Sequence, residues 1–197
     1  MPAFTNPALF PSFHELPSSS PPSASADNWF LLAQIKEDMT ITKPTLIVRD
    51  RAGVDFAVTF DDGDHRGLGG GGAGKARFRK GHTLVVPRAT RTDREDGKKA
   101  VVRVPEGRGK ETRVVPGSLE QVLELGGVVA GIEEGEGEGK KCAACGEVGS
   151  EGEGALMKCT GCGVAAYCSK ACQVRGWREM GHKSNCKVIK AIKEIWP

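Results

Sequence analysis

Short apolar runs separated by turn residues recur along the chain from Trp29 onward. The runs are partly β-branched, and runs of this kind bounded by Gly, Pro, Asp or Asn are typical of strands. They cover residues 29–33, 45–48, 54–60, 83–86, 100–104 and 113–115. This pattern predicts a small β-rich domain.

Two neighbouring runs are expected to pair as a hairpin, because residues 46–48 and 56–58 are joined through the polar, Gly-containing stretch 50–53. A short helix is predicted later, where Ser118 is followed three residues on by Gln121 in the capping-box pattern. Strands closed by one helix would fit an OB-like barrel, and the sequence leaves the strand connectivity open. The apolar face of the helix would consist of Leu119, Val122 and Leu123.

Composition divides the chain into four parts. Residues 1–26 are rich in Ser and Pro and have too little apolar surface to offset the entropy of ordering them, so we expect a disordered tail. Residues 27–130 would form the β-rich domain, with a Gly-rich loop at 61–76. Residues 131–141 alternate Gly with Glu, which predicts a solvated linker to a second folding unit at 142–197.

Location and cysteine usage bear on the second unit. The amino terminus lacks the charged start and apolar run of a secretory signal, and no stretch approaches the ~20 apolar residues of a membrane span. We therefore expect an intracellular protein, nuclear or cytoplasmic and not secreted.

All seven cysteines lie between 142 and 186, and in a reducing compartment such a cluster indicates metal binding before disulfides.

The candidate metal ligands fall into four pairs. A CxxC pair can hold one edge of a tetrahedral zinc site, because the tight turn between the thiols places both sulfurs on the same ion. The two later pairs are four residues apart, which puts both side chains on one side of a helical turn, and Ser169 is expected to cap the first of these helices. The pairs are Cys142 with Cys145, Cys159 with Cys162, Cys168 with Cys172, and His182 with Cys186. Eight ligands predict two zinc ions per chain.

The order CxxC, CxxC, CxxxC, HxxxC resembles the MYND finger, as do the segment Tyr167-Cys168-Ser169-Lys170-Ala171-Cys172-Gln173 and a Trp ahead of His182. Two loops, 146–158 and 178–181, are longer than is common in that family and read as insertions that leave the pairs intact. The resemblance implies interleaved sites and short helices, and hence an α+β protein. One zinc would lie on Cys142, Cys145, Cys168 and Cys172, and the other on Cys159, Cys162, His182 and Cys186.

The same resemblance implies a partner. MYND fingers take up peptides of the form Pro-x-Leu-x-Pro by strand addition to an exposed edge. Here the edge would be residues 163–167, and Tyr167, Gln173 and Trp177 match the positions beside the peptide. We therefore expect a zinc-dependent protein-protein interaction adaptor, in a regulatory or transcriptional assembly, and not an enzyme.

A self-contact is a further hypothesis, because Pro7, Leu9 and Pro11 in the expected tail fit the ligand form. They could occupy the finger of the same chain or of a neighbouring copy. After the last ligand, an apolar stripe on the helix 183–196 is expected to pack on the finger or on the β-rich domain. It consists of Val188, Ile189, Ile192, Ile195 and Trp196.

Nucleic-acid binding is the alternative function. Residues 77–103 are strongly basic, and Arg77, Arg79 and Lys80 would carry the contact to phosphates. Against this alternative, Phe78 is the one residue of the stretch that offers a base-stacking platform, whereas OB-type readers use several aromatics. The Gly-rich stretch 67–75 imitates a phosphate loop, but the sequence after it does not open a helix at which a phosphate could bind.

Overall fold

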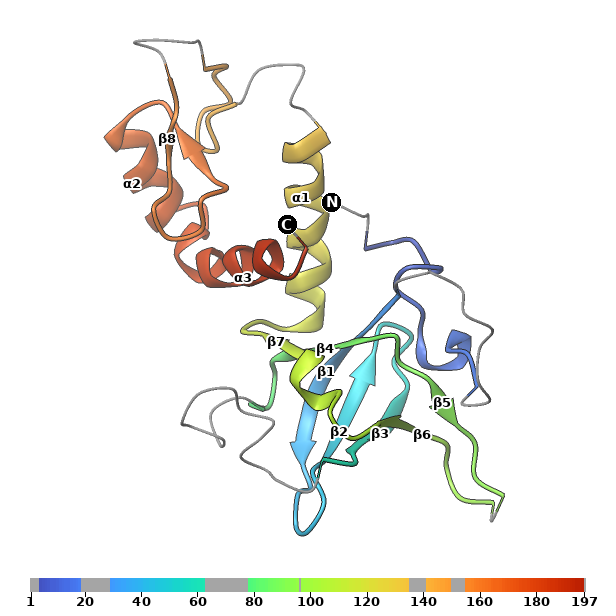
Figure 1. Cartoon of the computed structure of the whole chain (residues 1–197). Helices are drawn as coiled ribbons and strands as arrows, with labels where there is room; N and C mark the ends of the chain where they lie inside the picture. The colour runs from blue at the N-terminus through green and yellow to red at the C-terminus, as the bar shows by residue number, and fades with distance from the viewer. Residues whose placement is uncertain are drawn as a thin grey trace. The chain divides into compact units, whose positions relative to one another are not determined.

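The computed structural model describes residues 4–18, 29–62, 78–95, 97–134, 141–149 and 155–196. The chain divides into two compact units, Phe4–Gln121 and Val122–Pro197, which are described separately and called the β unit and the finger unit (Figure 1). The predicted Gly-rich loop lies outside the described residues from 63 onward. None of the helices in the described ranges is long and apolar enough to cross a membrane.

The β unit is built on one seven-stranded sheet in the order β5-β6-β3-β2-β1-β4-β7. Each predicted apolar run corresponds to a strand, which confirms the β-rich, α+β prediction, whereas the two-residue strand β5 was not predicted. The strands are β1 (Phe30–Asp38), β2 (Thr45–Asp50), β3 (Asp55–Phe60), β4 (Thr83–Pro87), β5 (Arg91–Thr92), β6 (Val101–Val104) and β7 (Arg113–Val115).

The predicted hairpin is formed by β2 and β3, in which Leu46 pairs with Val58 and Val48 with Phe56. These four side chains are buried, and the residues between them point to the other face. The alternation follows from the two-residue period of a strand, so the apolar pattern fixes the register as well as the presence of the hairpin.

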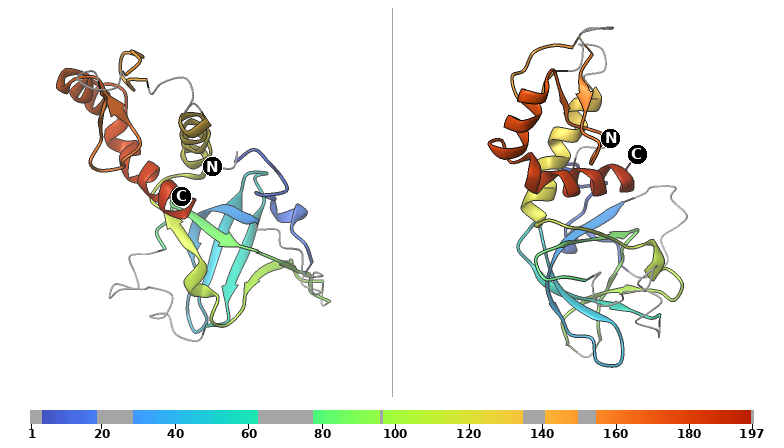
Figure 2. Two further views of the ribbon diagram at one scale, coloured as in Figure 1. Left: turned by 45° about the horizontal axis from the view of Figure 1, so that its top comes forward. Right: turned by 90° about the vertical axis from the view of Figure 1, so that its left-hand side faces the viewer.

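The sheet closes through one bent segment. β4 pairs with β1 and, three residues further on, β5 pairs with β6, which itself lies parallel to β3. The bend contains Arg88, whose φ of 50° is the one left-handed backbone conformation outside glycine among the described residues. The continuous stretch from β4 to β5 therefore pairs with β1 at its start and with β6 at its end. This agrees with the barrel-like arrangement expected, and Figure 2 shows the curvature of the strands.

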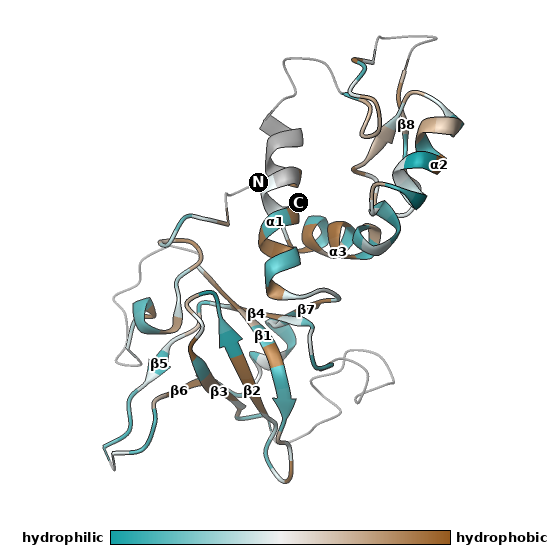
Figure 3. Ribbon diagram, turned by 180° about the vertical axis from the view of Figure 1, so that it is seen from behind, coloured by the Kyte–Doolittle hydropathy of each residue, from teal (hydrophilic) through white to brown (hydrophobic). Residues whose placement is uncertain are grey.

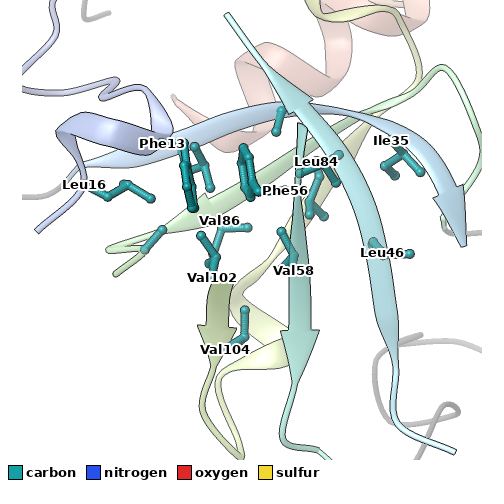
Figure 4. Close-up of a cluster of buried hydrophobic side chains, with 14 of the residues drawn as sticks. Phe13, Leu16, Ile35, Leu46, Phe56, Val58, Leu84, Val86, Val102 and Val104 are labelled. Carbon is teal, nitrogen blue, oxygen red and sulfur yellow. The ribbon is translucent and has the colours of Figure 1, made fainter. Parts of the chain in front are cut away.

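The expectation of a disordered tail is wrong for residues 4–18, because this segment is part of the β-unit core. Phe13, in a 3-10 turn (Phe13–Glu15), stacks on Phe56 with ring centroids 4.2 Å apart, and Leu16 is buried in the same cluster (Figure 4). The backbone N–H of Phe13 donates to Oδ2 of Asp50 at 2.7 Å. The aromatic side chains of this Ser/Pro-rich segment thus provide apolar surface that its overall composition did not indicate.

The segment 4–18 is also held by backbone hydrogen bonds, one near its middle and one at its carboxyl end. The N–H of Phe30 donates to the carbonyl of Leu9 at 2.7 Å, and the N–H of Arg91 donates to the carbonyl of Pro17 at 2.9 Å. Pro11 is buried and Phe10 is 1% exposed. The hypothesis of a self-contact through Pro7, Leu9 and Pro11 stays a prediction: Pro7 is exposed and Leu9 is half-buried, but Pro11 would have to leave the core of the β unit to reach a finger.

The helix α1 (Leu119–Glu134) begins where the capping box predicted, since the N–H of Gln121 donates to Oγ of Ser118 at 3.2 Å. Leu119 and Val122 are buried, and Leu123 is half-buried. The helix is longer than expected and includes residues 131–134, which were assigned to the linker, while 135–140 lie outside the described residues. The boundary between the two units falls within this helix, after Gln121, and not at residue 130.

The finger unit contains a two-stranded sheet and two further helices. These are β8 (Met157–Lys158), β9 (Ala166–Tyr167), α2 (Lys170–Arg178) and α3 (His182–Ile195). α3 is amphipathic, with brown bands beside teal ones in Figure 3, and the predicted apolar stripe is buried at Val188, Ile189, Ile192 and Trp196. The small sheet and the two helices position all eight candidate ligands.

Candidate metal centre

Local structure places each ligand pair. Cys142 and Cys145 form a turn that is closed by the N–H of Gly146 donating to the carbonyl of Cys142 at 2.9 Å. The N–H of Gly163 donates in the same way to the carbonyl of Cys159 at 2.8 Å, which closes the turn of the second CxxC pair. Both glycines have positive φ, 78° and 70°, a conformation that glycine adopts without a steric cost.

The other two pairs lie at helix starts. Ser169 caps α2 as predicted, because its hydroxyl accepts from the backbone N–H of Cys172 at 3.2 Å. α3 begins at His182, directly after Gly181, whose φ is 73°. Each helix therefore presents a residue of its first turn to a ligand cluster.

The first cluster unites Cys142, Cys145, Cys168 and Cys172, whose sulfurs all lie within 4.8 Å of one another. The Sγ atoms of Cys145 and Cys168 are 3.6 Å apart, and those of Cys168 and Cys172 are 3.5 Å apart. Cys142 is buried, whereas Cys145 is exposed. This cluster joins the first and third pairs in the chain.

The second cluster unites Cys159, Cys162, His182 and Cys186, and all four are buried. The Sγ atoms of Cys159 and Cys186 are 3.8 Å apart. Nε2 of His182 lies 3.2 Å from Sγ of Cys159 and 3.7 Å from Sγ of Cys162. The second and fourth pairs thus share one site, and the two sites interleave along the chain.

These distances fit zinc and not disulfides. A disulfide has a sulfur-sulfur distance of about 2.05 Å, whereas a tetrahedral ion with bonds of about 2.3 Å has ligand-ligand edges of about 3.8 Å. All seven cysteines are free thiols, and the observed separations cluster near that edge length. Two zinc ions, one per cluster, fit the residues present. Each ion would have four protein ligands, which leaves no open position for a reacting water.

The ionisation of the thiols shows why each cluster needs a cation. Burial raises the pKa of Cys142, but backbone N–H donors at Cys168, Ala144 and Cys145 outweigh it and lower that pKa to about 6. The neighbouring Cys172 sulfur raises the pKa of Cys168 to about 12. In the second cluster, burial and the Cys159 sulfur raise the pKa of Cys186 to about 12. One thiolate in each cluster thus opposes the ionisation of the next, and a bound dication removes this repulsion.

The finger packs around the second cluster through aromatic rings. The imidazole of His182 lies edge-to-face with the rings of Tyr167 and Trp177, with ring centroids 6.0 Å and 5.7 Å apart, respectively. Tyr167 is 1% exposed, so its ring is a core residue of the finger, and burial raises its pKa to about 12. Trp177 is 39% exposed, so one side of its ring contacts the ligand histidine while the other faces solvent.

The three residues expected beside a peptide therefore differ in availability. Trp177 and the half-buried Gln173 lie on α2 and can reach a partner, whereas the Tyr167 side chain cannot. The edge expected at 163–167 is also partly occupied, since the carbonyl of Ala166 accepts from the N–H of Ala143 at 2.8 Å. The backbone groups of Ala165 and Tyr167 point toward β8, whereas those of Ala166 point to the opposite edge, because alternate strand residues direct their backbone groups to opposite edges.

The basic stretch of the β unit offers little for base stacking. Phe78 is packed against the core, with its ring 5.7 Å from that of Phe60. Arg77 lies outside the described residues, and Arg79 and Lys80 are exposed. Phe78 is thus a core side chain and not a platform.

Comparison with known proteins agrees with this geometry. Residues 142–186 match the family model described as MYND finger, which confirms the resemblance inferred from the ligand order. The match begins and ends at a metal ligand and does not include the β unit. No curated protein matches the chain. Since MYND is a zinc-finger interaction domain and not an enzymatic family, the chain carries a zinc-binding module for protein partners.

Proposed function

We propose that this protein is an intracellular adaptor whose MYND finger binds proline-containing peptides of partner proteins, of the Pro-x-Leu-x-Pro type, in a regulatory assembly. The observation that carries the proposal is the half-exposed ring of Trp177, which is fixed on one side by a zinc ligand and open on the other. A rigid aromatic wall of this kind suits a proline ring, because little side-chain entropy is lost on contact.

An apolar surface beside Trp177 supports the proposal. Val174 precedes Trp177 by one helical turn on α2 and is 44% exposed, and Met180 follows the helix at 49%. Residues three apart lie on one helix face, so the two α2 side chains are neighbours. Exposed apolar side chains gathered in this way suit a docking surface.

The second element of the proposal is the edge of β8 that faces away from β9, which pairs with no other strand among the described residues. With the outer edge of β9 engaged by Ala143, strand addition would take place on β8, where Met157 is exposed. An extended peptide would then gain backbone hydrogen bonds from β8 and side-chain contacts from neighbouring apolar residues. The edge proposed for the peptide is therefore β8, one strand away from residues 163–167.

The test is the binding of a fluorescent Pro-x-Leu-x-Pro peptide to the zinc-loaded full chain, followed by anisotropy. Trp177→Ala should weaken binding by about tenfold or more, and Gln173→Ala should weaken it less. Lys187→Ala, on an exposed position of α3, is the matched control and should bind normally. The zinc content of each variant is measured by native mass spectrometry, so that loss of fold is recognised.

The alternative, nucleic-acid binding by the β unit, predicts a different outcome. Binding to RNA or DNA would fall steeply with salt and would depend on Arg79 and Lys80 but not on Trp177. If the peptide binds equally well to Trp177→Ala, or binds no better than a scrambled peptide, the adaptor proposal is wrong.

A further inference from the structure

A small pocket on the β unit lies outside everything assigned above. It opens between the end of β4 and the end of β6, and three arginines line it: Arg88, Arg103 and Arg108. Its cavity volume is about 30 Å³, two to three times the ~10–15 Å³ that a cavity needs to hold one water molecule. The pocket can therefore admit one compact chemical group and not an extended ligand.

One carboxylate holds two of the three guanidinium groups in place. Oε2 of Glu111 accepts from Nη2 of Arg88 at 2.9 Å and from Nη2 of Arg108 at 3.3 Å. Nη2 of Arg108 also donates to the carbonyl of Pro87 at 3.2 Å. Because a guanidinium carries five N–H donors, both arginines keep donors for a further acceptor.

The third guanidinium, that of Arg103, has no ion-pair or hydrogen-bond partner among the residues that the structure describes. Arg103 pairs with Thr59 through its backbone, and its exposed side chain projects from the outer face of β6. Three arginines against one glutamate leave the pocket with a net charge of plus two. An anion would therefore be attracted, and a dianion most strongly.

The backbone at Arg88 adds a second observation. Its φ of 50° lies in the left-handed region, which glycine adopts freely and which crowds the Cβ of any other residue. The bend between β4 and β5 would thus be formed with less strain by glycine. The chain instead places there a side chain whose guanidinium lines the pocket.

We propose that this pocket binds a phosphate monoester, the phosphorylated serine or threonine side chain of a partner protein. Planar guanidinium donors match phosphate oxygens in charge and in geometry, and clusters of arginines recognise phosphorylated side chains in this way. A monoester brings close to two negative charges in one compact group, which matches the formal net charge of the three arginines and Glu111.

A nucleic-acid backbone fits the pocket less well. Its diester groups carry one charge each and follow one another along a strand, so they call for a row of cations. The Phe78 ring, which could stack on a base, is packed on Phe60 instead. The proposal is independent of the finger, because all the residues concerned belong to the β unit.

The test uses the zinc-loaded full chain and three probes: a degenerate peptide pool with a central phosphoserine, the same pool with serine, and a short duplex DNA. Arg88→Gly is the decisive variant, since it removes the guanidinium while easing the backbone. We expect its melting temperature to be unchanged or raised, and its affinity for the phosphopeptides to fall by at least about tenfold. Arg103→Gln should show a similar loss of affinity.

The matched control is Arg94→Gly, which removes the same charge from an exposed position of the β5–β6 loop and should bind the phosphopeptides normally. The proposal is overturned if the serine pool binds as well as the phosphoserine pool, or if Arg88→Gly and Arg94→Gly lose affinity equally. Binding of the duplex DNA in an Arg88-dependent manner, without binding of the phosphopeptides, would assign the pocket to nucleic acid and also overturn it.

Discussion

Gly176 on α2 lies directly against the ring of Tyr167 on β9: a Cβ atom on Gly176 would fall 2.5 Å from Cε1 and 2.8 Å from the hydroxyl oxygen of Tyr167. Both residues are buried, so neither has room to withdraw. This contact sets the distance between the small sheet and the helix that carries Cys172. The absence of a side chain at position 176 is therefore a condition for the geometry of the zinc clusters.

Gly176→Ala should destabilise the finger. The added methyl group overlaps a ring that cannot move, and overpacking of this kind costs about 1–3 kcal/mol, more than the gain in helix propensity. The measurement is the rate at which a chelator removes zinc from the full chain, which should rise. Gly127→Ala is the control, because at this exposed position of α1 the new methyl group would meet no atom within 4 Å apart from its chain neighbours and the backbone of its own helix. Equal zinc release from both variants would contradict the role of the Gly176–Tyr167 contact.

The metal content itself is the next prediction. Native mass spectrometry of the full chain in reducing buffer should find two zinc ions, with all seven thiols protected from alkylation. Structural zinc supplies apparent free energy of about 10–16 kcal/mol per site, so its removal should unfold the finger. Acidification should have the same effect as a chelator, because protons compete with zinc for the thiolates. A single zinc ion per chain would overturn the two-cluster assignment.

The two zinc sites should be separable by one substitution. A Cβ on Gly161 would lie 2.8 Å from Sγ of Cys186, so Gly161→Ala disturbs the second cluster and not the first. We expect zinc release in two steps, with one ion lost early and the other retained as in the unsubstituted chain. Thr160→Ala, at the exposed neighbouring position, should release both ions normally. Simultaneous early loss of both ions from Gly161→Ala would show that the sites do not act separately.

The segment 4–18 should contribute to the stability of the β unit. Phe13 is 5% exposed and stacks on Phe56, so Phe13→Ala should lower the free energy of unfolding by about 3 kcal/mol. His14→Ala, at the exposed next position, should change it by less than about 0.5 kcal/mol. Chemical denaturation followed through the β unit distinguishes the two. If Phe13→Ala were as stable as His14→Ala, the segment would not be part of the core.

The sequence determined much of this protein because the relevant signals are local. Strand positions follow from short apolar runs, the start of α1 follows from Ser118 and Gln121, and α2 begins at Lys170, directly after the predicted cap Ser169. The zinc ligands follow from pair spacing and from the resemblance to the MYND finger, because each CxxC turn depends on neighbouring residues alone. The register of the hairpin could also be predicted from neighbouring residues, since a slip of one residue would turn Val48 and Phe56 to solvent.

The tertiary structure decided what depends on residues far apart in the chain. Only the fold places Phe13 on Phe56 and so converts a Ser/Pro-rich segment into core. Only the fold shows that Ala143 engages the carbonyl of Ala166, which moves the free sheet edge to β8. The closure through Arg88 and its pocket with Arg103 and Arg108 likewise depends on strand pairing between distant segments. Such contacts arise from the summed packing of the whole unit, and no window of neighbouring residues contains that information.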